Sequence, residues 1–476
     1  MKKKSEKLKM KKEGFGVFSM ANVFGTGCRY IKICLFVFCV LIAGNVLAQD
    51  FGFGFSDEET GSSAGVVNSL NVSLSGEVSA SMTGFFDDFS DGLEQVQLGD
   101  LFSGKLNFFA GTSIAEGVIN LNLDSSSISV DEAYLRLYLG SFDITAGLRK
   151  LTWGKVDVFG PLDVINPLNS SGIYTVMADQ SDLMSVKIAR PLVHASFRFG
   201  QFSKIEGVFV PNFEPHTIAQ TGRWADSRMG ILENPPIPLP PDSIAITEPD
   251  TGALNFAQTG LRFTTTIGSA DIGVQYYYGR LPQPSVGITL NILSPPPQIQ
   301  ANILYNPYHQ IGLDYAQVLF DFNVRAEVAA NITEDLKGDD GSVYNPFAAW
   351  SFGFDRDIQG INLNFQVDQN IRLLHNKVKS NDFMSGIFDI EDGLPLTATR
   401  LTATVSRKFL SDELELRVAV VWGIEDEDCV IMPALIWARD DIRFAISSGF
   451  FVGNSGGQLG QYRDNNFIKI SCAYTF

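Results

Sequence analysis

The sequence has few of the residues that build catalytic and metal sites. Histidine occurs only four times, and no two of these residues stand at a metal-ligand spacing: His194, His216, His309 and His375. Zinc-protease (H-E-x-x-H), P-loop and dinucleotide-binding motifs are absent. The alternative is a hydrolase whose catalytic partners meet only in the fold. The sequence therefore predicts no enzyme, no metal site and no cofactor.

Cysteine and positive charge are also scarce. Three of the five cysteines lie within residues 1–48, and the remaining two, Cys429 and Cys472, favour packed or lipid-facing thiols over a disulfide framework. Without the nine basic and two acidic residues of positions 1–48, 27 basic residues stand against 51 acidic ones, a net charge near −24. Such an acidic chain is not expected to bind nucleic acid, because phosphates require basic patches.

Long hydrophobic runs are missing, apart from one near the N-terminus. The run Ile33–Ala43 is too short to cross a bilayer as a helix, which takes about 20 residues. It follows a basic region and precedes Val46-Leu47-Ala48, a small-residue cleavage site. Residues 1–48 are therefore predicted to be a signal peptide, with Met20 as an alternative start. Residues 49–67 are predicted to form a short periplasmic segment.

The chain has many stretches in which apolar and polar side chains alternate. At the C-terminus, Ile468, Ile470 and Tyr474 fall on one face of an expected strand, while Lys469 and Ser471 fall on the other. Similar stretches recur over nine or more residues, the length that a tilted strand needs to cross a membrane. Alternation alone does not say which face is inside, so a soluble β-sandwich is the alternative.

Eighteen segments qualify as strands. Their predicted ranges are 68–85, 101–112, 115–124, 130–139, 142–152, 186–199, 203–211, 254–267, 270–280, 308–318, 320–332, 347–357, 360–374, 397–409, 413–424, 429–438, 441–452 and 466–476. Tight connections, such as Gly140-Ser141, Ile358-Gln359 and Arg439-Asp440, alternate with long ones, such as 153–185 and 212–253. This pattern predicts an all-β fold, an antiparallel transmembrane barrel of 16–18 strands over residues 68–476, with both termini on the short-turn side. Pro191 in the sixth strand indicates an edge, a bulge or a miscount, which is why sixteen is the second choice.

Two blocks and the terminal residue carry a family resemblance. The blocks are W-G-K-x-D at 153–157 with D-x-x-N-P at 163–167, and E-G-V-F-V-P at 206–211 with G-R-W at 222–224; the chain ends in Phe476. Together they resemble porin-like Gram-negative outer-membrane barrels. The resemblance implies a passive or substrate-selective channel in the outer membrane, surrounded by lipid and lipopolysaccharide. It also implies that Tyr474 and Phe476 form a signal for the barrel-assembly machinery, and it supplies no established binding residues.

Candidate pore residues lie in one link and on the polar strand faces. In or beside the link 153–185 they are Arg149, Lys155, Asp157, Asp163 and Asn166. On the strands they are Arg198, Arg262, Arg325, Glu327, Asp368, Arg372 and Arg417. Opposed charges in a lumen select solutes by a transverse field, or they merely pair across strands. Aromatic residues near strand ends are expected at the membrane interfaces: Tyr276, Tyr277, Tyr278, Trp350, Trp422 and Trp437.

The link 153–185 is predicted to fold back into the barrel and narrow it. It exceeds an ordinary connection in length, and apolar residues such as Leu162, Ile165 and Tyr174 argue against disorder. Burying half of its apolar groups against the wall contributes about 1.5 to 3 kcal/mol each before entropy is subtracted. The predicted function is diffusion of small solutes through a channel. A transporter of hydrophobic compounds, suggested by the 37 phenylalanines, and a structural surface antigen are the alternatives.

Overall fold

The structure of the chain is a computed structural model. It describes residues 70–86, 95–97, 102–158, 160–170, 173–179, 183–226, 244–291, 298–378 and 389–476. The predicted signal peptide (1–48) and the predicted N-terminal segment (49–67) lie outside the described residues. Residues 68 and 69 of the predicted barrel lie outside them as well.

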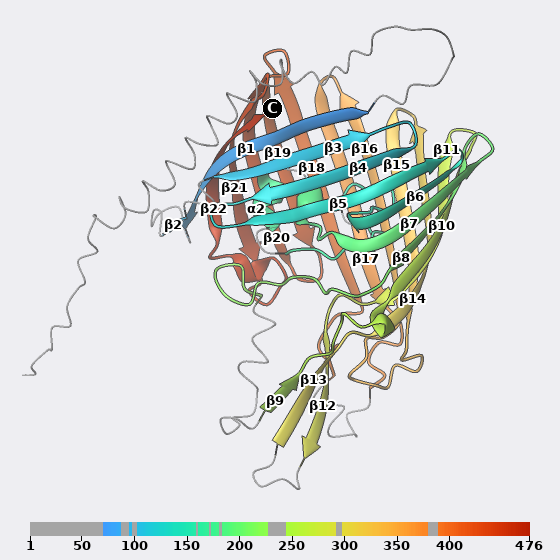
Figure 1. The fold of residues 1–476 in the computed structure, drawn as a ribbon. Coiled ribbons are helices and arrows are strands. Elements are labelled where there is room, and N and C mark those ends of the chain that lie inside the picture. The colour runs from blue at the N-terminus through green and yellow to red at the C-terminus, as the bar shows by residue number, and fades with distance from the viewer. Residues whose placement is uncertain are drawn as a thin grey trace, which may run out of the picture. The chain divides into compact units, whose positions relative to one another are not determined.

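Eighteen antiparallel strands close into a barrel (Figure 1). The ring strands are β1 (Asn71–Phe86), β3 (Ser103–Gly111), β4 (Ala115–Leu123), β5 (Ile128–Leu139), β6 (Phe142–Arg149), β7 (Arg190–Phe199), β8 (Ser203–Val210), β10 (Gln258–Ile267), β11 (Ala270–Arg280), β14 (Pro307–Leu319), β15 (Phe322–Thr333), β16 (Phe347–Ile358), β17 (Ile361–Arg372), β18 (Thr397–Phe409), β19 (Leu414–Gly423), β20 (Asp428–Arg439), β21 (Ile442–Gly453) and β22 (Asn466–Thr475). Each pairs with the next in chain order, and β1 closes the ring by pairing with β22 from Glu77↔Thr475 to Phe86↔Asn466. The short strand β2 (Gln95–Gln97) pairs with β1 alone.

The eighteen predicted segments correspond one to one to the ring strands, so the predicted all-β barrel and its larger strand number are confirmed. Both described ends of the chain lie at the short-turn end of the barrel, because Asn71 pairs with Gly111 beside the 112–114 turn and β22 runs towards the same end. Two predicted turns were off by one residue: Ile358 and Arg439 belong to strands, and the turns are 359–360 and 440–441. Their left-handed residues include Gln359 and Asp440, with φ of 54° and 52°.

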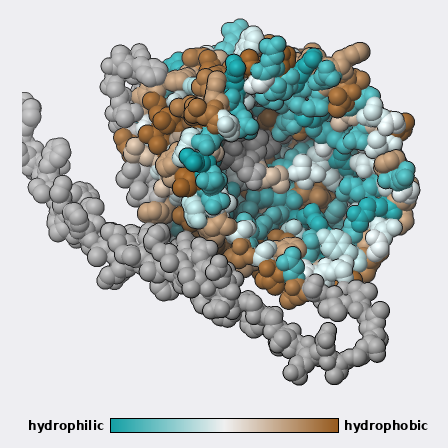
Figure 2. All heavy atoms as spheres, turned by 90° about the horizontal axis from the view of Figure 1, so that it is seen from above, coloured by the Kyte–Doolittle hydropathy of each residue, from teal (hydrophilic) through white to brown (hydrophobic). Residues whose placement is uncertain are grey.

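Apolar side chains cover the outside of the barrel, and polar ones line its lumen. On β14, Ile311 and Leu313 are 52% and 49% exposed, whereas the alternating Gln310 and Asp314 are 1% and 2% exposed. A view from above shows hydrophilic residues around the central hollow and hydrophobic residues at the outer rim (Figure 2). A soluble barrel would have the reverse arrangement, whereas a strand wall facing lipid has this one.

Two prolines lie where the ladder is incomplete. Pro191 pairs with Leu148 of β6, but β7 begins to pair with β8 only at Val193, so Pro191 is locally an edge residue. An edge position is one of those predicted for this proline, because it has no N–H to donate to a second neighbouring strand. Pro433 of β20 lies at a gap in the β20–β21 register between Ile431 and Ala434. Both strands keep their places in the ring.

A small second sheet lies at the long-loop end of the barrel, outside the ring (Figure 1). It consists of β9 (Ile244–Thr247), β12 (Ser285–Asn291) and β13 (Gln298–Leu304), and sequence reading missed it. The helices are short: α2 (Ile173–Asp179), η1 (Leu183–Val186), η3 (Leu254–Phe256) and η4 (Gly460–Tyr462). None of the helices in the described part of the chain is long and apolar enough to span a bilayer.

One of the aromatic residues expected at the membrane interface points the other way. Tyr277 is completely buried on the lumen side, and its hydroxyl donates to Gln258 Oε1 at 2.8 Å. Its neighbour Tyr276 faces outward and is 42% exposed. Trp422 also faces outward and is 48% exposed. The correction follows from strand geometry, because adjacent residues of one strand cannot both face lipid.

Candidate functional site

The link between β6 and β7, residues 150–189, is called the lumen loop here, and its described residues (150–158, 160–170, 173–179 and 183–189) lie inside the barrel. Its residues Trp153, Leu162 and Ile165 are at most 2% exposed, and they pack against the inner wall. The short helix α2 of the same loop lies within the ring (Figure 1). The described part of the loop confirms the prediction that this link folds back into the lumen.

Glu327, on the inner face of β15, fixes the first half of the lumen loop. Its carboxylate accepts hydrogen bonds from the backbone N–H groups of Lys155, Val156 (2.9 Å) and Leu162 (3.2 Å). The loop can approach this closely because two glycines border the carboxylate, and a Cβ at Gly154 or Gly160 would collide with it. Gly154 also has φ of +107°, a conformation that side chains disfavour.

Three glutamines on neighbouring strands extend this attachment. Gln366 of β17 donates to Val158 O at 2.7 Å and accepts from Val158 N at 3.1 Å. Gln310 of β14 donates to Pro161 O, and Gln275 of β11 donates to Leu162 O, both at 3.0 Å. Backbone groups of a buried loop need such partners. The loop therefore lies along the wall from β11 to β17 as a fixed layer.

Tryptophan 153 anchors the loop at its entry. A Cβ on Gly260 of β10 would lie 2.7 Å from the Trp153 ring, so only glycine leaves room for the ring at this point of the wall. The ring belongs to a buried cluster with Tyr277, Tyr308 and Val210. This close packing places Trp153, and with it the start of the W-G-K segment, against β10.

The second half of the lumen loop is attached to another part of the wall. Helix α2 packs against β20 and β21, and Arg417 of β19 donates to Met177 O at 2.5 Å. Around the helix, Tyr174 lies 6.0 Å from Trp224 and 5.3 Å from Phe451, measured between ring centroids. The described part of the lumen loop thus contacts two arcs of the barrel wall, β11–β17 and β19–β21, on either side of β18.

Asn166 holds the two ends of the lumen loop together. Its side chain is 3% exposed; Oδ1 accepts from Leu151 N at 2.7 Å, and Nδ2 donates to Arg149 O and Ile188 O at 3.1 and 2.9 Å. Every side-chain group of Asn166 is therefore engaged, which gives it a structural role in the loop. Asp163 is likewise enclosed and pairs with Lys187 Nζ at 2.5 Å. Burial raises the pKa of Asp163, and the adjacent ammonium acts against this.

Lys155 and Asp157 are the predicted loop residues that do reach the open lumen. The Asp157 carboxylate is 40% exposed, binds the Arg325 guanidinium, and accepts from Asn364 Nδ2 at 2.7 Å. Arg325 also binds Asp355 of β16 at 2.5 Å. Lys155 Nζ lies 3.8 Å from Asp271 of β11. These charges lie where the loop approaches the short-turn end of the barrel.

The remaining predicted charges are spread along the barrel and do not form one ring. Arg262 pairs with Asp314 at 2.7 Å, and both are buried, as is Arg417 under α2; these arginines, like Glu327, are corrected to structural roles. Arg198 pairs with Asp143 at 3.0 Å beside the 200–202 turn. Several of these charges therefore pair with side chains of other strands, as the second interpretation of the lumen charges predicted.

Three further predicted residues contact neighbouring side chains of the barrel wall and its links. Arg372 pairs with Glu391 at 3.4 Å at the long-loop end. Asp368 accepts from Ser351 Oγ at 2.5 Å and from Gln366 Nε2 at 2.8 Å. Arg149 donates to Thr145 Oγ1 at 3.3 Å and lies 5.1 Å from the Tyr134 ring centroid.

Sequence reading missed several residues that position the loop: Gln275, Gln310, Gln366, Trp224 and His216. In the sequence, the three glutamines look like ordinary polar residues on the polar face of an alternating strand. Trp224 belongs to the second block of the family resemblance, which gave it no role, and the structure packs it in a cluster with Tyr174 and Tyr462. Among the described residues, no group of three or more His, Cys, Asp or Glu could hold a metal ion.

His216 connects the lumen loop to the link after β8. Its Nδ1 accepts from Leu168 N at 2.9 Å, and Thr217 N donates to Leu168 O at 2.9 Å. Burial lowers the pKa of His216 to about 4. The folded value lies below the unfolded value of about 6.5, so the stability from this contact is complete above pH 6.5 and is lost as the pH falls towards 4.

We expect the melting temperature of the detergent-solubilised barrel to fall between pH 7 and pH 4, and His216→Asn to reduce this fall. Asparagine keeps an acceptor for Leu168 N but does not titrate in this range. Thermal unfolding followed by circular dichroism at both pH values tests the difference. An identical fall in the variant would assign the acid sensitivity to other groups.

No family model matches the sequence, and no curated protein matches it. Solved structures are similar at low sequence identity. OccK9 (OpdG) of Pseudomonas aeruginosa has a TM-score of 0.47 and 9% identity, over 86% of this chain and 98% of that chain. A mutant of the porin of Rh. blastica has a TM-score of 0.39 and 10% identity, over 85% and 100%. A loop-deletion mutant of OmpT, an outer membrane protein of Vibrio cholerae, has a TM-score of 0.38 and 9% identity, over 86% and 99%.

Proposed function

We propose that the chain is an outer-membrane channel for small hydrophilic solutes, and that the lumen loop sets the width of the passage. The observation that carries the proposal is the attachment of this loop to two arcs of a polar inner wall, by Glu327 on one side and by α2 on the other. A barrel of this strand number leaves an aqueous lumen unless something fills it. A fixed loop across the lumen leaves a passage narrower than the barrel itself.

The hydrophobic-compound alternative has less support. Exposed phenylalanines such as Phe108, Phe209 and Phe352 are 40–45% exposed on the outer surface, where lipid would cover them. The apolar residues on the inner wall of β20 and β21 are already covered by α2 and Trp224. The phenylalanine content is thus explained by the lipid-facing wall, and the surface-antigen alternative leaves the fixed loop without a role.

Planar-bilayer recording of the purified chain tests the channel directly. We expect stable ionic conductance steps, together with liposome swelling in small neutral sugars. A correctly folded barrel that shows neither, but takes up fatty acids or hydrocarbons, would contradict the proposal. The surrounding lipopolysaccharide and the assembly role of Tyr474 and Phe476 are part of the same proposal.

Asp157→Asn is expected to make the channel more anion-selective. In this proposal, the narrow part of the passage is where Asp157 and Arg325 meet near the short-turn end. The substitution removes the carboxylate from this narrow part and leaves the charge of Arg325 less compensated. A unit charge 4 Å from an ion in water is worth about 1 kcal/mol, so the permeability ratio should change by up to about fivefold. Reversal potentials in a salt gradient measure this ratio. Asp321→Asn, in an exposed turn outside the lumen, is the control and should leave it unchanged.

A further inference from the structure

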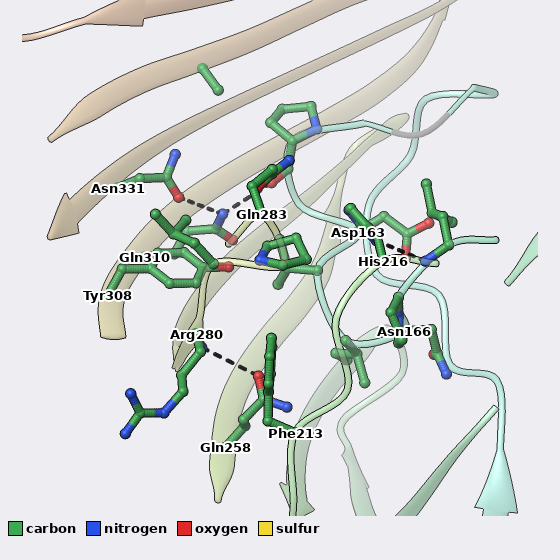
Figure 3. A pocket seen from close by; sticks show the side chains of 18 of the residues that line it. Asp163, Asn166, Phe213, His216, Gln258, Arg280, Gln283, Tyr308, Gln310 and Asn331 are labelled. Atoms are coloured by element: carbon green, nitrogen blue, oxygen red, sulfur yellow. Dashed lines mark hydrogen bonds between the residues drawn. The ribbon is translucent and has the colours of Figure 1, made fainter. Parts of the chain in front are cut away.

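A cavity of about 230 Å³ lies on the long-loop side of the lumen loop (Figure 3). Its walls are residues 160–168 of the loop, the links that follow β8 and β11, and the inner faces of β14 to β17. Tyr308 and Gln310 are the second and fourth residues of β14 from its long-loop end. The deepest loop contacts, Asp157 to Arg325 and Asn364, lie closer to the other end of the barrel. A solute entering from the long-loop end meets this cavity before the narrow part.

Several polar groups in the cavity wall have no partner among the described residues. The hydroxyl of Tyr308, a residue only 4% exposed, makes no hydrogen bond there, and neither does the side-chain amide of Asn370 or Gln283. Asn331 accepts from Gln310 Nε2 at 2.9 Å and leaves its own Nδ2 free. In Figure 3, Tyr308, Gln310 and Asn331 lie on one side of the cavity, and Asp163 and His216 lie on the other. Tyr308 and Asn331 are buried, whereas Asn370 and Gln283 are exposed. Buried polar groups normally have partners, so the free groups of Tyr308 and Asn331 that face the cavity indicate a ligand.

The carboxylates in the wall are already paired with basic side chains. Asp163 pairs with Lys187, and Glu214 pairs with Arg190. The Arg280 guanidinium has no carboxylate partner among the described residues, but it points away from the other labelled residues of the cavity in Figure 3 and donates to Tyr305 O and Asn255 O, at 2.8 and 2.9 Å. A charged solute would lose its hydration here without gaining a free counter-charge, which is costly. The cavity therefore favours an uncharged ligand.

Apolar surface completes the wall. Phe213, Phe347 and Leu281 line the cavity together with loop residues Val164 and Ile165. Apolar walls with a few free hydroxyl and amide groups are typical of small-molecule sites. Hydroxyl groups of a ligand can both donate and accept, so they suit amides and a phenol together, while C–H faces suit the aromatic rings.

We propose that this cavity is a binding site for an uncharged polyhydroxylated solute of about monosaccharide size, held before it passes the lumen loop. The proposal rests on the channel function proposed above and adds a solute class to it. Tyr308 and Asn370 are assigned as ligand contacts, together with the free Nδ2 of Asn331. The site determines which solutes are retained, while the narrow part determines which can pass.

Interruption of the ionic current by D-glucose tests the site in planar bilayers that contain the full channel. We expect a saturable decrease of current when glucose is added on the long-loop side. Tyr308→Phe and Asn370→Ala should each weaken glucose binding about threefold to tenfold, the usual effect of losing one hydrogen bond. Neither side chain has a hydrogen-bond partner among the residues that the structure describes, so both variants should fold. D-glucuronate and D-glucosamine, which carry a charge, should bind more weakly than glucose.

Asn362→Ala is the matched control, because this lumen-side asparagine of the same strand lies eight residues from Asn370 and outside the cavity. Equal glucose affinity in wild type, Tyr308→Phe and Asn370→Ala would overturn the site, and so would a current decrease that does not saturate. If ions pass but glucose does not interrupt them, the site fails and the channel stands. If no ions pass, the channel proposal fails, and equilibrium dialysis of labelled glucose against the detergent-solubilised variants decides the site.

Discussion

Replacing Glu327 with alanine is expected to loosen the lumen loop and to raise both the conductance and the current noise of the channel. In the folded barrel this side chain is 3% exposed and accepts three backbone hydrogen bonds from the loop. Hydrogen bonds to a charged group contribute about 1.5 to 3 kcal/mol each. Alanine would leave three N–H groups without this acceptor, so the segment 154–162 should move away from the wall and sample several positions.

The increase should be partial, because other attachments remain. Gln275, Gln310 and Gln366 still bond to the loop backbone, and α2 still packs on β20 and β21. Glu327→Gln should fall between wild type and alanine, since its amide keeps one acceptor oxygen and turns an N–H₂ group towards donors. Single-channel recording gives both the mean current and its fluctuation.

Glu415→Ala is the control for the loss of a lumen charge. Glu415 lies on the polar face of β19, like Glu327 on β15, but it makes no hydrogen bond to the lumen loop among the described residues. If Glu415→Ala raises the conductance and noise as much as Glu327→Ala does, the effect comes from charge and not from loop attachment. Unchanged strand content by circular dichroism ensures that all variants are compared as folded barrels.

The ring of strands could be predicted from sequence because strand geometry and the membrane together leave few choices. Side chains alternate across a strand, so a lipid-facing wall needs an apolar residue at every second position, as in Phe320 to Ala330 and Ile361 to Leu373. Turn residues such as Gly140 and Gly268, with φ of +70° and +65°, mark the short connections. Even Pro191 fitted, because the strand there has only one paired neighbour.

The candidate site was less predictable, because burial inside a lumen has no periodic signal. Asn166, Asp163 and Arg262 looked like lumen-facing polar groups, and the fold encloses each of them with a specific partner. Glu327 was selected as a charge, whereas its role is to bind backbone N–H groups 165 to 172 residues away in sequence. The cavity beside Tyr308 is lined by three links and by strands β10, β11 and β14 to β17, and contacts of that range depend on the closed ring.

Removing the lumen loop is expected to produce the largest increase in conductance. The loop can be cut where its ends meet, because Lys187 Nζ donates to Thr152 Oγ1 at 2.7 Å. Replacing residues 153–186 with a four-residue glycine-serine linker would join these ends without moving β6 or β7. It removes Trp153, the Glu327-bound segment and α2 together, and the open lumen of an eighteen-stranded barrel should then conduct ions severalfold better.

Exclusion of polymers gives a second, independent measure of the same change. Poly(ethylene glycol) molecules too large to enter the wild-type lumen should enter the variant and reduce its current, since the loop that lies against the β11–β17 and β19–β21 arcs is gone. The surfaces that the loop covered, including Met432 and Phe451, would become exposed to water, so the variant should also melt at a lower temperature. A folded variant with wild-type conductance and the wild-type polymer cut-off would contradict this prediction. It would show that residues 153–186 do not limit the ion current and that the passage is narrowed elsewhere.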